Sequence, residues 1–159
     1  MKRILLLFFT ILLLFCACQR DQNTKTPPIQ AVREAIIGAV DFKEELVALD
    51  EDYVEANFSC ENEIDDCTIY LGTAREIGIF KLEEDGNAEM TEKTIKEYLK
   101  NEVNSISTLL ELYPSDELEE RLSHYKNATV VQKGRYVCYF ALPKSEAEQA
   151  EKAMLEALK

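Results

Sequence analysis

The segment Glu76-Ile77-Gly78-Ile79-Phe80-Lys81-Leu82 is rich in residues that favour β-strands, and its apolar middle predicts a strand at the centre of a sheet. A second β-rich run covers residues 67–71. Only Gly72-Thr73-Ala74-Arg75 separates the two runs, which is short enough for an antiparallel hairpin. This hairpin is therefore the expected centre of the fold.

Upstream of the hairpin, the chain predicts one helix and one strand. Apolar residues recur at helical spacing from residue 29, directly after two prolines, which favours a helix that starts there. Residues 53–58 alternate, with Val54, Ala56 and Phe58 on one side. This alternation is typical of a half-buried strand.

Downstream of the hairpin, helices flank a second hairpin. Thr91 is the expected N-cap of a long helix, and Ser145 with Glu148 forms a capping box that predicts the start of the last helix. The expected elements are, in order, a long helix with its apolar stripe over residues 95–110, a short helix over 116–124, strands over 129–132 and 136–142, and the last helix.

This order of elements predicts the α+β class. We expect a single domain over residues 29–159, with a mostly antiparallel five-stranded sheet and helices packed on one face. A chain of this size buries roughly two-thirds of its unfolded surface, so folding needs neither a metal nor a cofactor.

The first 17 residues have the layout of a signal peptide. Lys2 and Arg3 precede an apolar run over residues 4–17, and polar residues follow at once. The run is too short for a membrane-spanning helix, which needs about 20 residues. The sequence therefore predicts export.

The end of this run, Leu14-Phe15-Cys16-Ala17-Cys18, resembles a bacterial lipobox, with Cys18 as the lipid acceptor. Cleavage by ordinary signal peptidase, with Cys18 left as a thiol, is the alternative. Residues 18–28 end in Pro-Pro and predict a lipidated cysteine and flexible tether. Lipid on Cys18 would hold the domain at the membrane, on the outer face of the bacterial cytoplasmic membrane.

Three cysteines remain in the expected domain. Cys60 and Cys67 lie seven positions apart, at the ends of segments that a hairpin would bring together, and we expect a disulfide between them. Two free thiols are the alternative. Cys138 lies in a strongly apolar strand and is expected in the core rather than as a nucleophile.

The distribution of charge excludes nucleic acid as a partner and indicates a candidate site for a cation. The formal net charge is −12, so the chain will not gather phosphate backbones, and nucleic acid is excluded as a partner. Eleven acidic residues stand against one lysine over residues 41–66. Glu61, Glu63, Asp65 and Asp66 would suit weak binding of Ca²⁺, whereas a solvated acidic loop is the alternative. Residues 127–144 hold three basic residues and no acid.

No pattern in the sequence identifies catalytic residues. Glycine-rich phosphate loops, G-x-S-x-G, HExxH and CxxC are all absent from the sequence. His124 is expected on the surface, near the end of a short helix. We therefore expect a binding or accessory module for an envelope protein or cell-wall partner. A small carboxylate-dependent hydrolase or transferase and a Ca²⁺-binding structural element are the alternatives.

Several segments together resemble the lipoproteins of Gram-positive bacteria grouped as domain-of-unknown-function family 4358. Besides the lipobox and tether, these are Thr73-Ala74-Arg75-Glu76-Ile77-Gly78-Ile79-Phe80, a long helix that ends near Tyr113-Pro114, and Lys133-Gly134-Arg135-Tyr136-Val137 before an apolar strand. The similarity covers about residues 48–158. It implies a membrane-anchored extracytoplasmic domain and carries over no catalytic residue. The pair Cys60 and Cys67 is not part of the family pattern.

Overall fold

The computed structural model describes residues 26–159 except residue 43 and residues 59–63. Its elements are, in chain order, α2 (Ile29–Ala39), β1 (Val47–Ala48), α3 (Glu51–Asn57), β2 (Ile64–Leu71), β3 (Glu76–Leu82), α4 (Ala88–Leu112), α5 (Asp116–Lys126), β4 (Thr129–Lys133), β5 (Tyr136–Ala141) and α6 (Lys144–Ala157).

The five strands form one sheet in the order β1-β2-β3-β5-β4, and every neighbouring pair is antiparallel. The strand β3 is central, as expected, because it pairs with β2 on one side and β5 on the other. Both predicted hairpins are present as β2–β3 and β4–β5. The predicted α+β class, the single domain and the five-stranded antiparallel sheet are therefore confirmed.

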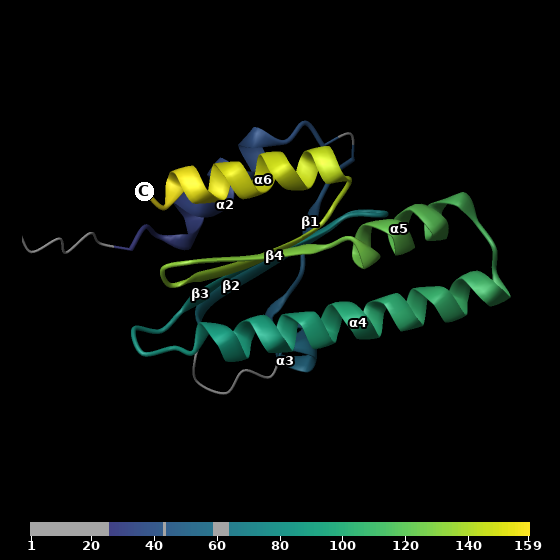
Figure 1. Ribbon diagram of the computed structural model, residues 1–159, viewed down its shortest axis with the longest axis horizontal. Coiled ribbons are helices and arrows are strands. Elements are labelled where there is room, and N and C mark those ends of the chain that lie inside the picture. The colour runs from purple at the N-terminus through teal and green to yellow at the C-terminus, as the bar shows by residue number, and fades with distance from the viewer. Residues whose placement is uncertain (1–25, 43, 59–63) are drawn as a thin grey trace, which may run out of the picture.

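Helices cover both faces of this sheet, rather than the one face that we expected (Figure 1). The helices α2 and α6 pack against each other on one face, and α4 with α5 covers the opposite face. The reason lies in the central strands, since every residue of β5 and all but one of β3 are buried. Strands that are apolar on both sides require cover on both sides.

The segment 53–58, expected as a strand, is helix α3 with Phe58 as its C-cap. Asp50 begins this helix, because its carboxylate accepts a hydrogen bond of 3.0 Å from the backbone N–H of Tyr53. Val54 and Phe58 are four residues apart, so a helix also places both on its buried side. The edge position of the sheet is taken instead by the two-residue strand β1.

Two predicted helix starts are also wrong. Asn87, not Thr91, caps α4, and its side chain accepts a hydrogen bond of 3.1 Å from the N–H of Met90. Thr91 lies inside the helix and is buried. The helix α6 starts after Pro143 with no side-chain cap, which places Ser145 within its first turn. The predicted start of α2 at residue 29 is confirmed.

Candidate functional site between α4 and β4

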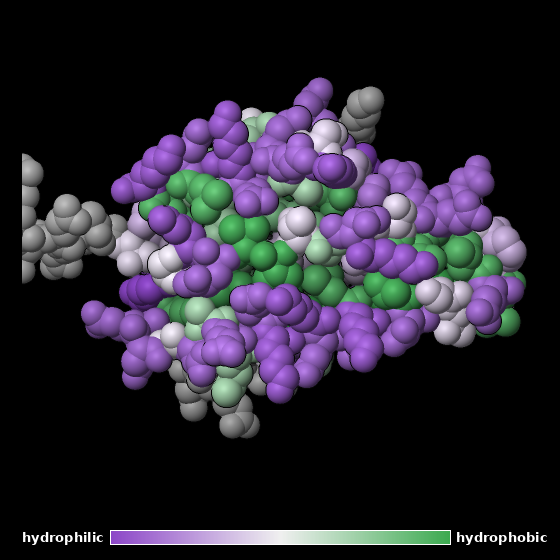
Figure 2. All heavy atoms as spheres, viewed as in Figure 1, coloured by the Kyte–Doolittle hydropathy of each residue, from purple (hydrophilic) through white to green (hydrophobic). Residues whose placement is uncertain are grey.

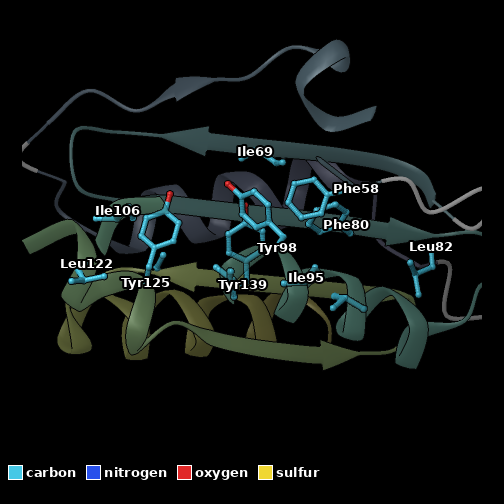
Figure 3. Packing of buried hydrophobic residues seen from close by; sticks show 13 residues of the cluster. Phe58, Ile69, Phe80, Leu82, Ile95, Tyr98, Ile106, Leu122, Tyr125 and Tyr139 are labelled. Atoms are coloured by element: carbon cyan, nitrogen blue, oxygen red, sulfur yellow. The ribbon is translucent and has the colours of Figure 1, made fainter. Parts of the chain in front are cut away.

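A buried carboxylate lies under the helices α4 and α5. Glu76, the first residue of β3, is 0% exposed. Tyr98 of α4 donates a hydrogen bond of 2.7 Å to its Oε1, Tyr139 of β5 donates to the same oxygen, and Tyr125 of α5 donates to Oε2. Figure 3 shows these three tyrosines close together among the buried apolar residues. Three hydroxyl donors thus replace the water that the carboxylate loses on burial.

The environment keeps these hydroxyls protonated. Burial, followed by the charges of neighbouring groups that include Glu76, raises the pKa of Tyr98, Tyr125 and Tyr139. Tyr53 of α3 extends the network, since its hydroxyl lies 2.9 Å from that of Tyr98. Glu76 thus accepts hydrogen bonds from three residues and is closed to solvent, so it holds α4, α5 and β5 against β3.

Gly78 makes room for one of these tyrosines. It pairs with Tyr139 across β3 and β5. A Cβ on Gly78 would lie 2.0 Å from Cε1 of the Tyr139 ring, a distance that real atoms do not reach. The missing side chain therefore lets the Tyr139 ring lie over β3, with its hydroxyl on Glu76.

Arg121 connects the tyrosines to the surface. Its guanidinium lies 5.3 Å from the centre of the Tyr125 ring, and one of its nitrogens lies 3.4 Å from the Tyr125 hydroxyl. The same nitrogen lies 3.6 Å from a carboxylate oxygen of Glu102. Helix α5 is thereby fixed to α4 through a charged pair beside the buried cluster.

A groove of about 380 Å³ opens beside Tyr125, between α4, the end of α5 and β4. Its apolar lining comes from Leu99, Val103, Tyr125, Ala128 and Val130, and its polar lining from Lys96, Lys100 and Lys126. Lys96 also pairs with Glu92 at 2.5 Å. In the described part of the chain, Lys100 and Lys126 have no ion pair, so two ammonium groups remain available at the groove.

The strand β4 forms one edge of the sheet. It pairs with β5 on one side, and among the described residues no strand pairs with its other side. Every second residue of such a strand directs its N–H and C=O groups away from the sheet. Figure 2 shows an apolar band across this side of the molecule, between hydrophilic layers above and below, where Figure 1 places β4. The groove and the strand edge thus form one continuous surface, which we call the β4 surface.

A second charged cluster lies at the β2–β3 turn. Arg75 makes a two-pronged contact with Glu146 of α6, at 2.8 and 3.2 Å, and a hydrogen bond of 2.9 Å with Glu44. Burial alone would raise the pKa of Glu44, but hydrogen bonds from the backbone of Thr73 and from Arg75 hold it below its usual value. Both carboxylates are committed to Arg75, so this cluster joins the turn to α6 and to the segment before β1.

His124 is buried, contrary to our expectation of a surface residue. It does lie in the last turn of α5, but its Nδ1 lies 2.8 Å from the carbonyl oxygen of Ala74. The β2–β3 turn packs over α5 at this point, and the hydrogen bond ties the two together. The predicted core position of Cys138 is confirmed, and burial raises the pKa of its thiol.

Several predicted site residues lie outside the described residues, namely Cys18, Cys60, Glu61 and Glu63 together with the signal peptide over residues 1–17. Lipidation of Cys18 and the disulfide between Cys60 and Cys67 stay predictions. Cys67 lies on β2 opposite Phe80 of β3.

The two described members of the expected Ca²⁺ site are Asp65 and Asp66 on β2. Lys81 bonds to the Asp65 carboxylate, and Arg135 lies 3.4 Å from the same oxygen. The hydrogen bond from Lys81 lowers the pKa of Asp65. A calcium ion would have to displace these two cationic side chains. In the described ranges, no group of three or more His, Cys, Asp or Glu side chains is placed to hold a metal ion.

Sequence reasoning missed both the buried cluster and the β4 surface. Glu76 was visible only as an acidic residue at the start of an apolar strand, and its tyrosine partners are 22 to 63 positions away. The signal for the groove was the pair Lys96 and Lys100, one helical turn apart beside the apolar stripe.

Comparison of the chain with protein-family models, with curated proteins and with solved structures gives no match in any of the three. None of the helices that the structure describes combines the length and the apolar character needed to span a membrane.

Proposed function

We propose that the protein is a lipid-anchored binding module on the outer face of the bacterial cytoplasmic membrane, and that its envelope partner binds at the β4 surface. The observation that carries this proposal is the combination of an open strand edge with an apolar groove beside it. An edge strand offers backbone hydrogen bonds, and an adjoining apolar groove offers area to bury.

The position of the tether is compatible with this assignment. Tyr136 donates a hydrogen bond of 2.6 Å to the carbonyl of Pro27, so the last tether residues lie against the domain beside the β4–β5 turn. The C-terminus lies at the same end, and the α4–α5 connection lies at the opposite end (Figure 1). The β4 surface runs along the side between these ends, and none of the described tether residues 26–28 lines its groove.

The binding site is tested by crosslinking in intact cells. A photo-crosslinking amino acid replaces Gln132, an exposed residue of β4, in the full chain, and the matched control places it at Lys152, an exposed residue of α6. We expect a defined adduct from position 132 that position 152 does not give, identified by mass spectrometry. Equal adducts at the two positions, or none at 132, would overturn the proposal.

The anchor is tested separately by metabolic labelling with a fatty-acid analogue. We expect the full chain to carry the label and the Cys18→Ser variant to lose it, because the predicted acceptor is then a hydroxyl. Label retained by Cys18→Ser would contradict lipidation at this residue.

A further inference from the structure

We propose that the β4 surface binds an extended, acidic polypeptide segment that pairs with β4 as an additional strand and directs alternate carboxylates at the lysines of the groove, at Lys100 and Lys126 directly and at Lys96 in exchange for its exposed partner Glu92. This inference rests on the proposed function, and it specifies the chemistry of the partner. Three features of the surface support this inference: the free backbone edge of β4, the spacing of the lysines on α4 and the charge of the groove.

The backbone of β4 selects an extended polypeptide. Five residues of β4 pair with β5, from Thr129 opposite Phe140 to Lys133 opposite Tyr136, so a regular ladder ends at this strand. The opposite edge of the sheet differs, because only two residues of β1 pair with β2 there. A strand added along β4 would span about 17 Å and gain hydrogen bonds at every second residue.

The spacing of the lysines matches a strand. Lys96 and Lys100 are four residues apart on α4, which places them about 6 Å apart along the helix. Alternate residues of an extended chain are about 6.6 Å apart and lie on the same side of the strand. Two acidic residues separated by one residue can therefore meet Lys100 directly and Lys96 in exchange for its exposed partner Glu92.

The charge of the surface selects an acidic segment. Three lysines and no carboxylate line the groove, and among the described residues Lys100 and Lys126 have no ion pair, although the whole chain carries a formal net charge of −12. A second copy of this chain is disfavoured because two strongly acidic molecules repel each other, and because Lys133 of each β4 would lie at the shared edge. An acidic strand, in contrast, is attracted locally and steered to the groove.

The test uses the full chain and a fluorescent peptide in which glutamate alternates with valine. Fluorescence anisotropy should show saturable binding that weakens as salt is added. We expect the double variant Lys100→Glu, Lys126→Glu to weaken binding at least about tenfold, and the exposed control Lys152→Glu to leave it unchanged within about twofold. Circular dichroism confirms that each variant is folded.

Two peptides, N-methylated at alternate amides on opposite edges, test strand pairing. Only the peptide methylated on the edge that faces β4 should lose binding, because the other edge points to solvent. Equal loss or equal retention would overturn strand pairing, as would equally tight binding of inorganic polyphosphate, which has no backbone amides. Self-association through β4 in sedimentation experiments would assign the surface to a second copy instead.

This result is separable from the test of the proposed function. A crosslinked partner at position 132 together with no peptide binding would leave the binding module standing and reject the acidic strand. No specific crosslink at position 132 would reject the binding module itself.

Discussion

Gly78 shows how the absence of one side chain determines the position of a neighbouring residue, Tyr139. A glycine inside a strand usually weakens it, since there is no side chain to pack. Here the Tyr139 ring occupies the space where a Cβ would be, and its hydroxyl bonds to the buried Glu76. The glycine, the tyrosine and the carboxylate therefore form one unit across β3 and β5.

We predict that Gly78→Ala destabilises the protein by at least about 2 kcal/mol, because the Tyr139 ring must move and its hydrogen bond to Glu76 is strained or lost. Urea unfolding measures the change in the free energy of unfolding. Near-ultraviolet circular dichroism reports the packing of the tyrosines without overlap from tryptophan, which the chain lacks.

The matched control is Gly38→Ala in α2, where nothing lies within 4 Å of the added Cβ. Alanine favours the helix, so stability should stay the same or rise by up to about 1 kcal/mol. Equal effects of the two substitutions would show that the close approach of Tyr139 to Gly78 carries no energetic weight.

At this scale the sequence predicts apolar burial well and polar burial poorly. Cys138 was expected in the core because its neighbours in sequence are apolar, and it is buried. Glu76 and His124 are also buried, although nothing adjacent to them required it. Their burial depends on hydrogen-bond partners supplied by distant segments, such as Tyr98 for Glu76 and Ala74 for His124.

At the scale of elements, Arg75 joins several segments of the chain at the end of the sheet opposite the β4–β5 turn. Its side chain is 15% exposed and reaches Glu44 before β1, Glu146 on α6 and, at 3.8 Å, Glu120 on α5. Hydrogen bonding to Glu146 above all raises the pKa of Arg75. One guanidinium thus holds three carboxylates from three segments of the chain.

We predict that Arg75→Ala lowers the free energy of unfolding by about 3–5 kcal/mol, since it leaves two partly buried carboxylates unpaired. Arg75→Lys should recover only part of this loss, because an ammonium group cannot make the two-pronged contact with Glu146. Denaturant unfolding at neutral pH measures both variants.

The control is Lys144→Ala, which removes the exposed ion pair between Lys144 and Glu148 of α6, 4.0 Å apart. This substitution should lower the free energy of unfolding by no more than about 0.5 kcal/mol. A loss for Arg75→Ala as small as for Lys144→Ala would mean that the charged cluster does not stabilise the joined segments.

The elements themselves were predictable where the pattern had one interpretation. The hairpins β2–β3 and β4–β5 carry turn residues between β-rich runs and were confirmed. Residues 53–58 were ambiguous, because Val54 and Phe58 fit one side of a strand and one side of a helix equally. Asp50, outside that window, settles the matter by capping α3. The length of a pattern and its caps, rather than its periodicity alone, separate the two structures.

For the whole molecule, the α+β class and the four strands of the two hairpins were predictable, but the fifth strand and the layering were not. A single sheet with helices on one face and the same sheet with helices on both faces have the same order of elements. The distinguishing signal is the composition of β3 and β5, which are apolar on both sides. The β4 surface arises from this layering, since α4 overhangs the edge strand on one side of the sheet.

Because of the buried tyrosines, the free energy of unfolding of the whole domain depends on pH in the alkaline range. Burial above all raises the pKa of Tyr98, Tyr125 and Tyr139 in the folded state, and that of Tyr136 to about 12. In the unfolded chain each tyrosine titrates near pH 10. Above that pH the unfolded state holds fewer protons than the folded state, so the free energy of unfolding falls as pH rises.

We predict that the contribution of these tyrosines to stability is complete below about pH 10 and that, above it, the loss approaches about 1.4 kcal/mol per pH unit for each buried tyrosine. Urea unfolding followed by far-ultraviolet circular dichroism at stepped pH measures the slope. Tyr98→Phe should make the slope shallower, because one titrating group is removed, whereas Tyr113→Phe, at a ring that is 70% exposed, should leave it unchanged. A free energy of unfolding that stays constant from about pH 9.5 to 11.5 would show that these hydroxyls are not held protonated by the fold.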